Sequence, residues 1–167
     1  MARLPKQQNN PMRRRQAVIR EPQADPKFNS KLVAKFINMI MTRGKKTVSE
    51  NIVYGAFSIL EQKIPDMGGL KIFNKALENV RPRLELKARR VGGATYQVPI
   101  EVAVNRGNSL AMRWISDFAQ KKKGRPMRNK LAEELLAAYK GEGAAVKKRD
   151  DTHKMADANK AFAHLRW

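Results

Sequence analysis

The chain has 167 residues and a formal net charge of +20, from 35 lysines and arginines against 15 aspartates and glutamates. Such a field attracts polyanions, so the composition predicts a nucleic-acid partner. The absence of cysteine excludes a disulfide scaffold and a cysteine-based zinc site. No apolar run approaches the roughly 18 residues of a membrane span, and we expect no signal peptide because the basic start lacks an apolar segment.

Residues 1–24 are rich in proline, glutamine, asparagine and arginine, with Glu21 as the one acid. Such a segment buries too little apolar surface to offset its ordering entropy, so we predict a flexible basic arm. Its six cations favour phosphate binding over a merely solubilising tail: Arg3, Lys6, Arg13, Arg14, Arg15 and Arg20. An organellar presequence is a further alternative, although Pro5 and Pro11 would interrupt its helix.

Residues 25–167 carry the helical patterns of one domain. The first helix is predicted to begin at Asp25-Pro26, a capping carboxylate followed by proline, and to end at Gly44. Its apolar residues recur every four positions: Phe28, Leu32, Phe36 and Ile40.

A second helix is predicted from Thr47 and Glu50, which have capping-box spacing, to Pro65. The alternative is that Lys45 and Lys46 are already helical. A third helix follows Gly68-Gly69 and is closed by Pro82.

Residues 84–104 predict a β-hairpin. Apolar residues alternate along two stretches: Leu84, Leu86 and Ala88, then Tyr96, Val98, Ile100, Val102 and Val104. Gly92-Gly93 supplies the positive φ angles of a tight turn between them. No acid lies between Lys87 and Ile100, so the ribbon has an apolar base and a cationic tip.

Three more helical patterns follow the hairpin. The first carries Leu110, Trp114 and Phe118, with Ala111 and Ile115 alongside, and we expect Trp114 to lie in the core. The second carries Met127, Leu131, Leu135 and Tyr139. The last, at about 146–167, is polar with a thin stripe of Met155, Ala158 and Phe162; its final Trp167 could stack on a base or cover a protein. The fold class is therefore mainly α: about six helices with a protruding two-stranded β-ribbon.

Nothing in the sequence indicates catalysis. His153 and His164, the only histidines, are interpreted as helix-surface or RNA-contacting residues. Glu133-Glu134 and Asp150-Asp151 are sequence neighbours that point to different helix faces, so we interpret them as solvated-face or capping residues. Gly92-Gly93 lacks the following GK[ST] of a P-loop. We predict no enzyme, no cofactor, no metal site and no small-molecule substrate.

The basic clusters come from separated parts of the chain. Residues 121–130 hold six cations and no anion, among them Lys121, Lys122 and Arg125, and another cluster is Lys147-Lys148-Arg149. Like charge at this density is self-repelling unless a polyanion neutralises it. Contacts on several faces suit folded RNA better than a single DNA groove. A DNA-bending protein with the same ribbon, and an RNA-acting enzyme, are the alternatives.

Several long segments resemble small-subunit ribosomal protein seven of the bacterial and organellar type, from about Asp25 to the end. They are DPKFNSKLVAKFINMIMTRGKK at 25–46, ENVRP at 78–82, KARRVGGATYQVP at 87–99, AMRWI at 111–115 and VKKRDDTHKMADANKAFAHLRW at 146–167. The arm before Asp25 matches less well and is longer than expected for the bacterial family.

The resemblance implies a primary rRNA-binding protein that binds the 3′ major domain of small-subunit rRNA and nucleates assembly of the head. It implies a place beside the exit site, with small-subunit ribosomal proteins nine and eleven as neighbours and the final helix near exit-site tRNA. The expected location is the cytoplasmic ribosome, or an organellar one. Some family members also repress their own mRNA.

The same resemblance implies two sets of contacts. The arm, the first helix with its lead-in and the following turn would hold rRNA, through Arg13, Arg14, Arg15, Lys27, Lys31, Lys35, Lys45 and Lys46. The ribbon tip would approach exit-site tRNA or mRNA, through Lys87, Arg89, Arg90, Val91, Gly92, Gly93 and Tyr96.

Overall fold

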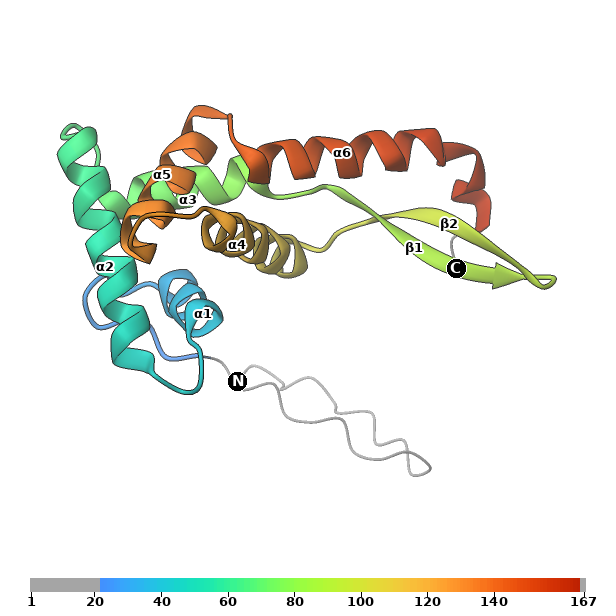
Figure 1. The fold of residues 1–167 in the computed structure, drawn as a ribbon. Helices are drawn as coiled ribbons and strands as arrows, with labels where there is room; N and C mark the ends of the chain where they lie inside the picture. The colour runs from blue at the N-terminus through green and yellow to red at the C-terminus, as the bar shows by residue number, and fades with distance from the viewer. Residues whose placement is uncertain (1–21, 166–167) are drawn as a thin grey trace, which may run out of the picture.

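The computed structural model describes residues 22–165 as a helical body from which one β-hairpin extends (Figure 1). In chain order the elements are α1 (Lys31–Ile40), α2 (Lys46–Lys63), α3 (Gly69–Val80), β1 (Leu84–Val91), β2 (Ala94–Glu101), α4 (Val104–Lys121), α5 (Met127–Lys140), α6 (Ala144–Ala158) and a 3₁₀ helix, η1 (Lys160–Leu165). The predicted fold class is confirmed. The predictions for Arg3, Arg13, Arg14, Arg15 and Trp167 lie outside the described residues.

Helices α1 to α5 form a body whose core is aromatic. Phe36, Phe57 and Phe73 come from three different helices and have no exposed surface. The ring centroid of Phe73 lies 5.1 Å from that of Phe36 and 5.4 Å from that of Phe57. Helix α5 packs against α2 and α3 and adds Leu131 and Leu135 to the same core.

The predicted start of the first helix is wrong by five residues, since the capping residue is Ser30 and not Asp25. Asp25 accepts hydrogen bonds from the N–H groups of Lys27 and Phe28, at 3.2 and 3.0 Å, and so caps an isolated turn. Asn29 then has a φ of 47°, which interrupts the helical backbone. Helix α1 begins at Lys31, where the Ser30 hydroxyl accepts the Val33 N–H.

The predicted boundary between α1 and α2 also needs correction. Helix α1 ends at Ile40, and Gly44, with a φ of 75°, lies in the connecting turn. The Thr47 capping box is wrong, because α2 begins at Lys46 without a side-chain cap. The alternative that Lys46 is already helical is confirmed, with Lys45 as the N-cap residue.

The β-ribbon is confirmed, with a shorter second strand than predicted. Strands β1 and β2 pair antiparallel, and the turn at Gly92 and Gly93 has φ angles of 57° and 91°. Strand β2 ends at Glu101, and Val104 is the first residue of α4, with 59% of its surface exposed. Beyond Glu101, Val102 still donates its N–H to the Arg83 carbonyl at 3.0 Å, but the Arg83 N–H donates to His153, so the ladder ends there.

The sequence predicts that helix α4 buries the face of Leu110, Trp114 and Phe118, but the face beside it is the buried one. Ala111, Ile115 and Ala119 are fully buried, whereas Trp114 and Phe118 are partly buried and pack against the margin of the core. Trp114 thus packs against the core and does not lie within it, whereas its apolar stripe predicts a core position. Helix α5 follows the predicted pattern and ends at Gly141, which has the left-handed conformation of a C-cap.

Helix α6 runs beside the ribbon, away from the body (Figure 1). The prediction of one helix over 146–167 is wrong, because α6 ends at Ala158 and η1 follows. Asn159 stops α6 by donating its side-chain amide to the Met155 carbonyl at 2.7 Å. The predicted stripe is also misplaced, since Met155 is 44% exposed and its neighbour Ala156 is buried. Among the described helices, none is long and apolar enough to cross a membrane.

Candidate nucleic-acid interface

The base of the ribbon is fixed to the body by polar contacts. Arg106 of α4 donates from Nε to both carboxylate oxygens of Glu85, at 2.7 and 2.9 Å. This hydrogen bond and the negative charge of Glu85 raise the pKa of Arg106 above its ordinary value. On the other side, His153 Nε2 of α6 accepts the backbone N–H of Arg83 at 3.0 Å. His153 is therefore a structural acceptor, and its proton in the neutral ring is on Nδ1.

Further out, an aromatic contact joins the ribbon to η1. The ring of Tyr96 lies 5.2 Å from that of Phe162, centroid to centroid. Tyr96 is half-buried and faces Arg89 across the strand pair. It is therefore a packing residue of the ribbon as well as a candidate contact.

The strand register divides the predicted ribbon residues between two faces. Residues directly opposite in an antiparallel pair point to the same side, and Arg89 pairs with Tyr96 while Arg90 pairs with Thr95. Arg89 therefore shares the face that packs on η1. Arg90 and Thr95 lie on the other face, where both are exposed. Exposed Gly92 and Gly93 form the tip, and no other part of the described chain lies within 4 Å of a side chain built there.

A second group of predicted cations lies along α1 and the turn after it. Lys31, Lys35, Lys45 and Lys46 are all exposed. Lys46 reaches Glu50 at 3.8 Å in a solvent-exposed pair, which competes little with a phosphate. These side chains form a cationic surface on the body.

Lys27 is part of a packed cluster beside this surface. Its Nζ lies 5.5 Å from the ring centre of Phe28 and 5.1 Å from that of Tyr54. The Tyr54 hydroxyl donates to Asp25 Oδ1 at 2.7 Å. Burial, this hydrogen bond and the nearby carboxylates raise the pKa of Tyr54 to about 12.

Cations in the loop after α4 are partly neutralised by α5. Lys122 pairs with Glu134 at 2.9 Å, and Arg125 pairs with Glu133. Glu134 is only 2% exposed and also accepts the Ala145 N–H at the start of α6. The capping interpretation of Glu134 is thus confirmed, and the solvated-face one is wrong. Glu133 and Glu134 therefore neutralise two of the six cations of residues 121–130.

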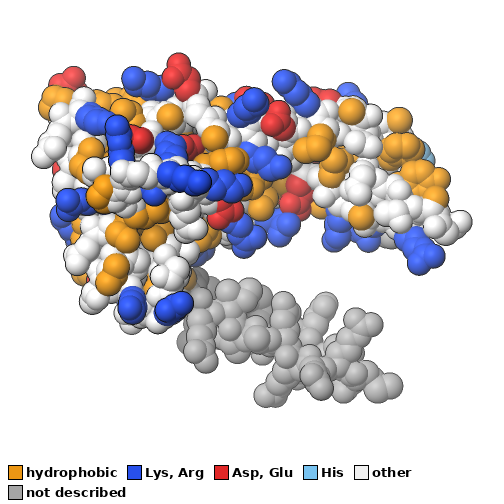
Figure 2. Space-filling model, viewed as in Figure 1, with side chains coloured by type: hydrophobic (Ala, Val, Ile, Leu, Met, Phe, Trp, Pro, Cys, Tyr) orange, Lys and Arg blue, Asp and Glu red, His pale blue; other side chains and the backbone are white. Residues whose placement is uncertain are grey.

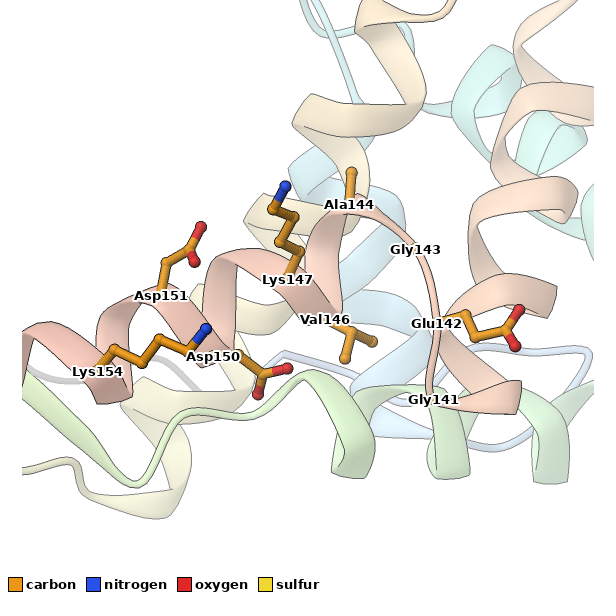
Figure 3. Close-up of a pocket in the computed structure, with 9 residues that line it drawn as sticks. All are labelled: Gly141, Glu142, Gly143, Ala144, Val146, Lys147, Asp150, Asp151 and Lys154. Atoms are coloured by element: carbon orange, nitrogen blue, oxygen red, sulfur yellow. The ribbon is translucent and has the colours of Figure 1, made fainter.

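Helix α6 holds a third group of candidates in mixed surroundings. A hollow of about 490 Å³ lies at the turn into α6. Figure 3 draws its lining residues: Lys147 and Asp151 extend from one side of the helix, and Asp150 points to the other. Because acidic and basic groups alternate in its lining, this hollow is not an anion site. Lys147 and Lys148 are exposed nearby.

Arg149 is engaged within the protein. Its guanidinium pairs with Asp150 at 2.6 Å and donates to the Asn79 carbonyl of α3. The Asn79 side chain in turn donates to the carbonyls of Ala138 and Tyr139 at the end of α5. Arg149 and Asn79 together therefore join three helices.

Residues 12–160 match the family model of ribosomal protein S7p/S5e. The chain belongs to this family. It is 58% identical over 156 residues to small ribosomal subunit protein uS7 of Thermotoga maritima, which covers 93% of this chain and 100% of the relative. It is 56% identical over 155 residues to the uS7 protein of Francisella tularensis subsp. holarctica, covering 93% and 99%. The resemblance drawn from the sequence motifs is confirmed.

Membership in the S7p/S5e family disfavours the two alternative functions, an RNA-acting enzyme and a DNA-bending protein. The family consists of structural proteins and not of enzymes, in agreement with the prediction that the chain is not an enzyme. A ribosomal family favours RNA over the DNA-bending alternative. Within residues 22–165, no three histidine, aspartate or glutamate side chains group as a metal site would require.

Lysines and arginines cover both parts of this S7-family fold on the face shown in Figure 2. The structure brings the predicted residues together in three places: the α1 surface, the loop before α5, and the ribbon with α6. The sequence predicts that Arg81 and Arg83, between α3 and β1, meet a polyanion as members of a basic cluster, without assigning them to rRNA, tRNA or mRNA. Their sequence signal was present in the run of cations at 81–90, offset only by Glu85.

Proposed function

We propose that the chain is a structural constituent of the small ribosomal subunit in bacterial-type cytoplasmic ribosomes. In this role it binds the 3′ major domain of small-subunit rRNA, nucleates assembly of the head and places its β-ribbon at the exit site near tRNA and mRNA. The observation that carries the proposal is the 58% identity to a uS7 protein across that relative's whole length. Ribosomal proteins nine and eleven are the proposed protein neighbours.

The distribution of charge gives this function a mechanism. Each lysine or arginine that neutralises a phosphate releases counterions, which makes affinity high and steeply dependent on salt. With about six to ten phosphates contacted, log K should fall with log salt at a slope of roughly −4 to −9. Phosphate contacts position the protein, and the shape of a folded RNA junction supplies selectivity.

The two parts of the molecule suit different parts of this role. The α1 surface, with Lys31, Lys35 and Lys45, is carried by helices with a shared core and suits a stable rRNA contact. The ribbon tip extends beyond the body (Figure 1) and suits a contact with a ligand that enters and leaves. Glycine at the tip also lets the backbone approach RNA closely.

Binding of the purified protein to a 3′-domain rRNA fragment, against an equally long duplex DNA, tests the proposal across a salt series. We expect tight binding to the rRNA that survives DNA competitor and has a slope in the stated range. Equal affinity for both nucleic acids, lost together as salt rises, would contradict it, because charge alone would then explain the binding.

A further inference from the structure

A basic hollow lies where the body meets the ribbon. It has a volume of about 400 Å³ and is enclosed by the end of α3, the linker of residues 81–83 and α6. Its lining includes Lys75, Glu78, Arg81, Arg83, Arg149 and Asp150. We call it the linker hollow.

Both acids of the linker hollow already have a cation. Lys75 Nζ donates to Glu78 at 3.0 Å, and this hydrogen bond and charge lower the pKa of Glu78 below its ordinary value. Asp150 is paired with Arg149. The two pairs cancel in charge, so the guanidinium groups of Arg81 and Arg83 give the hollow its net positive charge.

Neither of those two guanidinium groups forms a close ion pair or a hydrogen bond with the described part of the chain, although the positive charge of Arg81 helps to lower the pKa of Glu78. They differ in this from Arg149, Arg125 and Arg106, which are all paired with carboxylates. An arginine side chain offers five N–H donors and no acceptor. The hollow therefore presents unused donors, which suit an anion.

The linker holds both arginines in place. The backbone N–H of Arg83 is bound to His153. The aliphatic stem of Arg81 packs on Gly107, where an added Cβ would lie 2.8 Å from Arg81 Cγ. Donors on a fixed backbone lose less entropy on binding than donors on a mobile loop.

We infer that the linker hollow binds a phosphate group of the RNA backbone through Arg81 and Arg83. This inference rests on the proposed function and deepens it, because it places an rRNA contact between the body and the ribbon. Arginine suits this task because its planar fork can donate two parallel hydrogen bonds to one phosphate. Arg149, which stays a predicted rRNA contact, also neutralises Asp150 and ties α6 to α3 behind the site.

The first test is the salt dependence of binding to the 3′-domain rRNA fragment by Arg81→Gln, Arg83→Gln and the double variant. Each single change should weaken binding roughly tenfold and make the slope shallower by about 0.7 to 0.9. Lys63→Gln is the matched control, since Lys63 is an exposed cation in the last turn of α2. It should leave both quantities close to those of the unaltered protein.

Thermal unfolding of each variant separates a lost contact from a lost fold. Arg83→Gln is the decisive single variant, because the backbone hydrogen bond of residue 83 to His153 does not depend on its side chain. Arg81→Gln is less decisive, because the Arg81 side chain also packs on Gly107 and its loss could disturb the fold. An unchanged affinity and slope for folded Arg83→Gln and the double variant would overturn the inference.

The second test uses the absence of cysteine from the chain. Glu78→Cys places a single thiol at the rim of the linker hollow, and an iron chelate attached there cleaves nearby RNA backbone. We expect cleavage of one short stretch of the rRNA fragment that the same chelate on Lys63→Cys leaves intact. No cleavage in a complex of normal affinity would overturn the inference.

The two proposals fail differently. If the unaltered protein does not prefer rRNA to duplex DNA, the proposed function fails. If it prefers rRNA and the linker variants bind as well as it does, only the phosphate site fails. Variants that keep rRNA binding but lose a neighbouring protein during subunit assembly would assign the hollow to an acidic protein segment, which also overturns it.

Discussion

The helical body and the ribbon with α6 are stabilised by different means. In the body, aromatic rings from α1, α2 and α3 are fully buried and contact one another. In the ribbon, Val98 and Pro99 are the buried residues among those of β1 and β2. The ribbon is held by Arg106, His153 and Phe162 at separate points. The comparison teaches that unfolding free energy resides mainly in the body, while the ribbon can change its contacts without unfolding the protein.

Truncation of a core aromatic residue in the body should lower the free energy of unfolding more than any other change proposed below. Phe57→Ala should lower the free energy of unfolding by about 3–5 kcal/mol, because it leaves a cavity in a close-packed aromatic core. Urea or guanidinium denaturation measures it. A matched truncation in the ribbon, Val98→Ala, should cost less; an equal or larger loss there would contradict the comparison.

Replacing Gly92 and Gly93 by valine tests the ribbon. Each valine meets a positive φ and should strain the tip by about 1–3 kcal/mol. We expect the body to keep its denaturation midpoint while exit-site tRNA binding and reading-frame maintenance are impaired in ribosomes that carry the variant. Thr95→Val, on the same ribbon without positive φ, is the control. Normal exit-site behaviour of the glycine variant would remove the ribbon from the mechanism.

A smaller effect concerns the turn that leads into the body. Tyr54→Phe should cost about 0.5–1.5 kcal/mol at neutral pH, because Asp25 loses a hydrogen-bond donor. The folded pKa of Tyr54, about 12, is above the ordinary value of 10.0. The contribution is therefore complete below pH 10 and is lost as pH rises toward 12. Denaturation of both proteins from pH 8 to 11 should show the difference shrinking above pH 10; a constant difference would contradict this.

The smallest expected effect is that of Arg106→Gln. The pair with Glu85 is exposed on the arginine side, so the unfolding midpoint should hardly change. Amide hydrogen exchange at the ribbon base should become faster, for example at Val102, whose N–H donates to the Arg83 carbonyl. Unchanged exchange would mean that the ion pair does not hold the ribbon.

Local chemistry predicted the hairpin and most of the helices. A Gly-Gly pair between two stretches of alternating apolar residues favours a two-residue hairpin turn. Such a turn pairs Val91 with Ala94, as observed. In this register every even-numbered residue of β1 pairs with an odd-numbered residue of β2. The even-numbered residues of the two strands therefore lie on opposite faces, and this follows from the position of the turn in the sequence.

Tertiary contacts decided what the sequence could not. Asp25 and Ser30 are both good helix-capping residues. In the structure Ser30 caps α1, and Asp25 instead accepts a hydrogen bond from the Tyr54 hydroxyl of α2. Residues 121–130 contain no acid, so their positive charge looks uncompensated in the sequence. The carboxylates that pair with Lys122 and Arg125 are Glu134 and Glu133, which lie in the following helix. The same limit hid the hollow at Arg81 and Arg83, because the sequence does not show that Lys75 pairs with Glu78 and Arg149 with Asp150.

The packing of α5 across α2 and α3 has a consequence for the order of synthesis. The apolar faces that carry Phe57 and Phe73 are complete once α3 ends at Val80, but α5 ends only at Lys140. At about 5–20 residues per second, the intervening 60 residues take roughly 3–12 s to make. During that interval a nascent chain exposes half-covered aromatic faces beside a concentrated positive charge. The body therefore closes late, and the growing chain is open to chaperones or to RNA before α5 arrives.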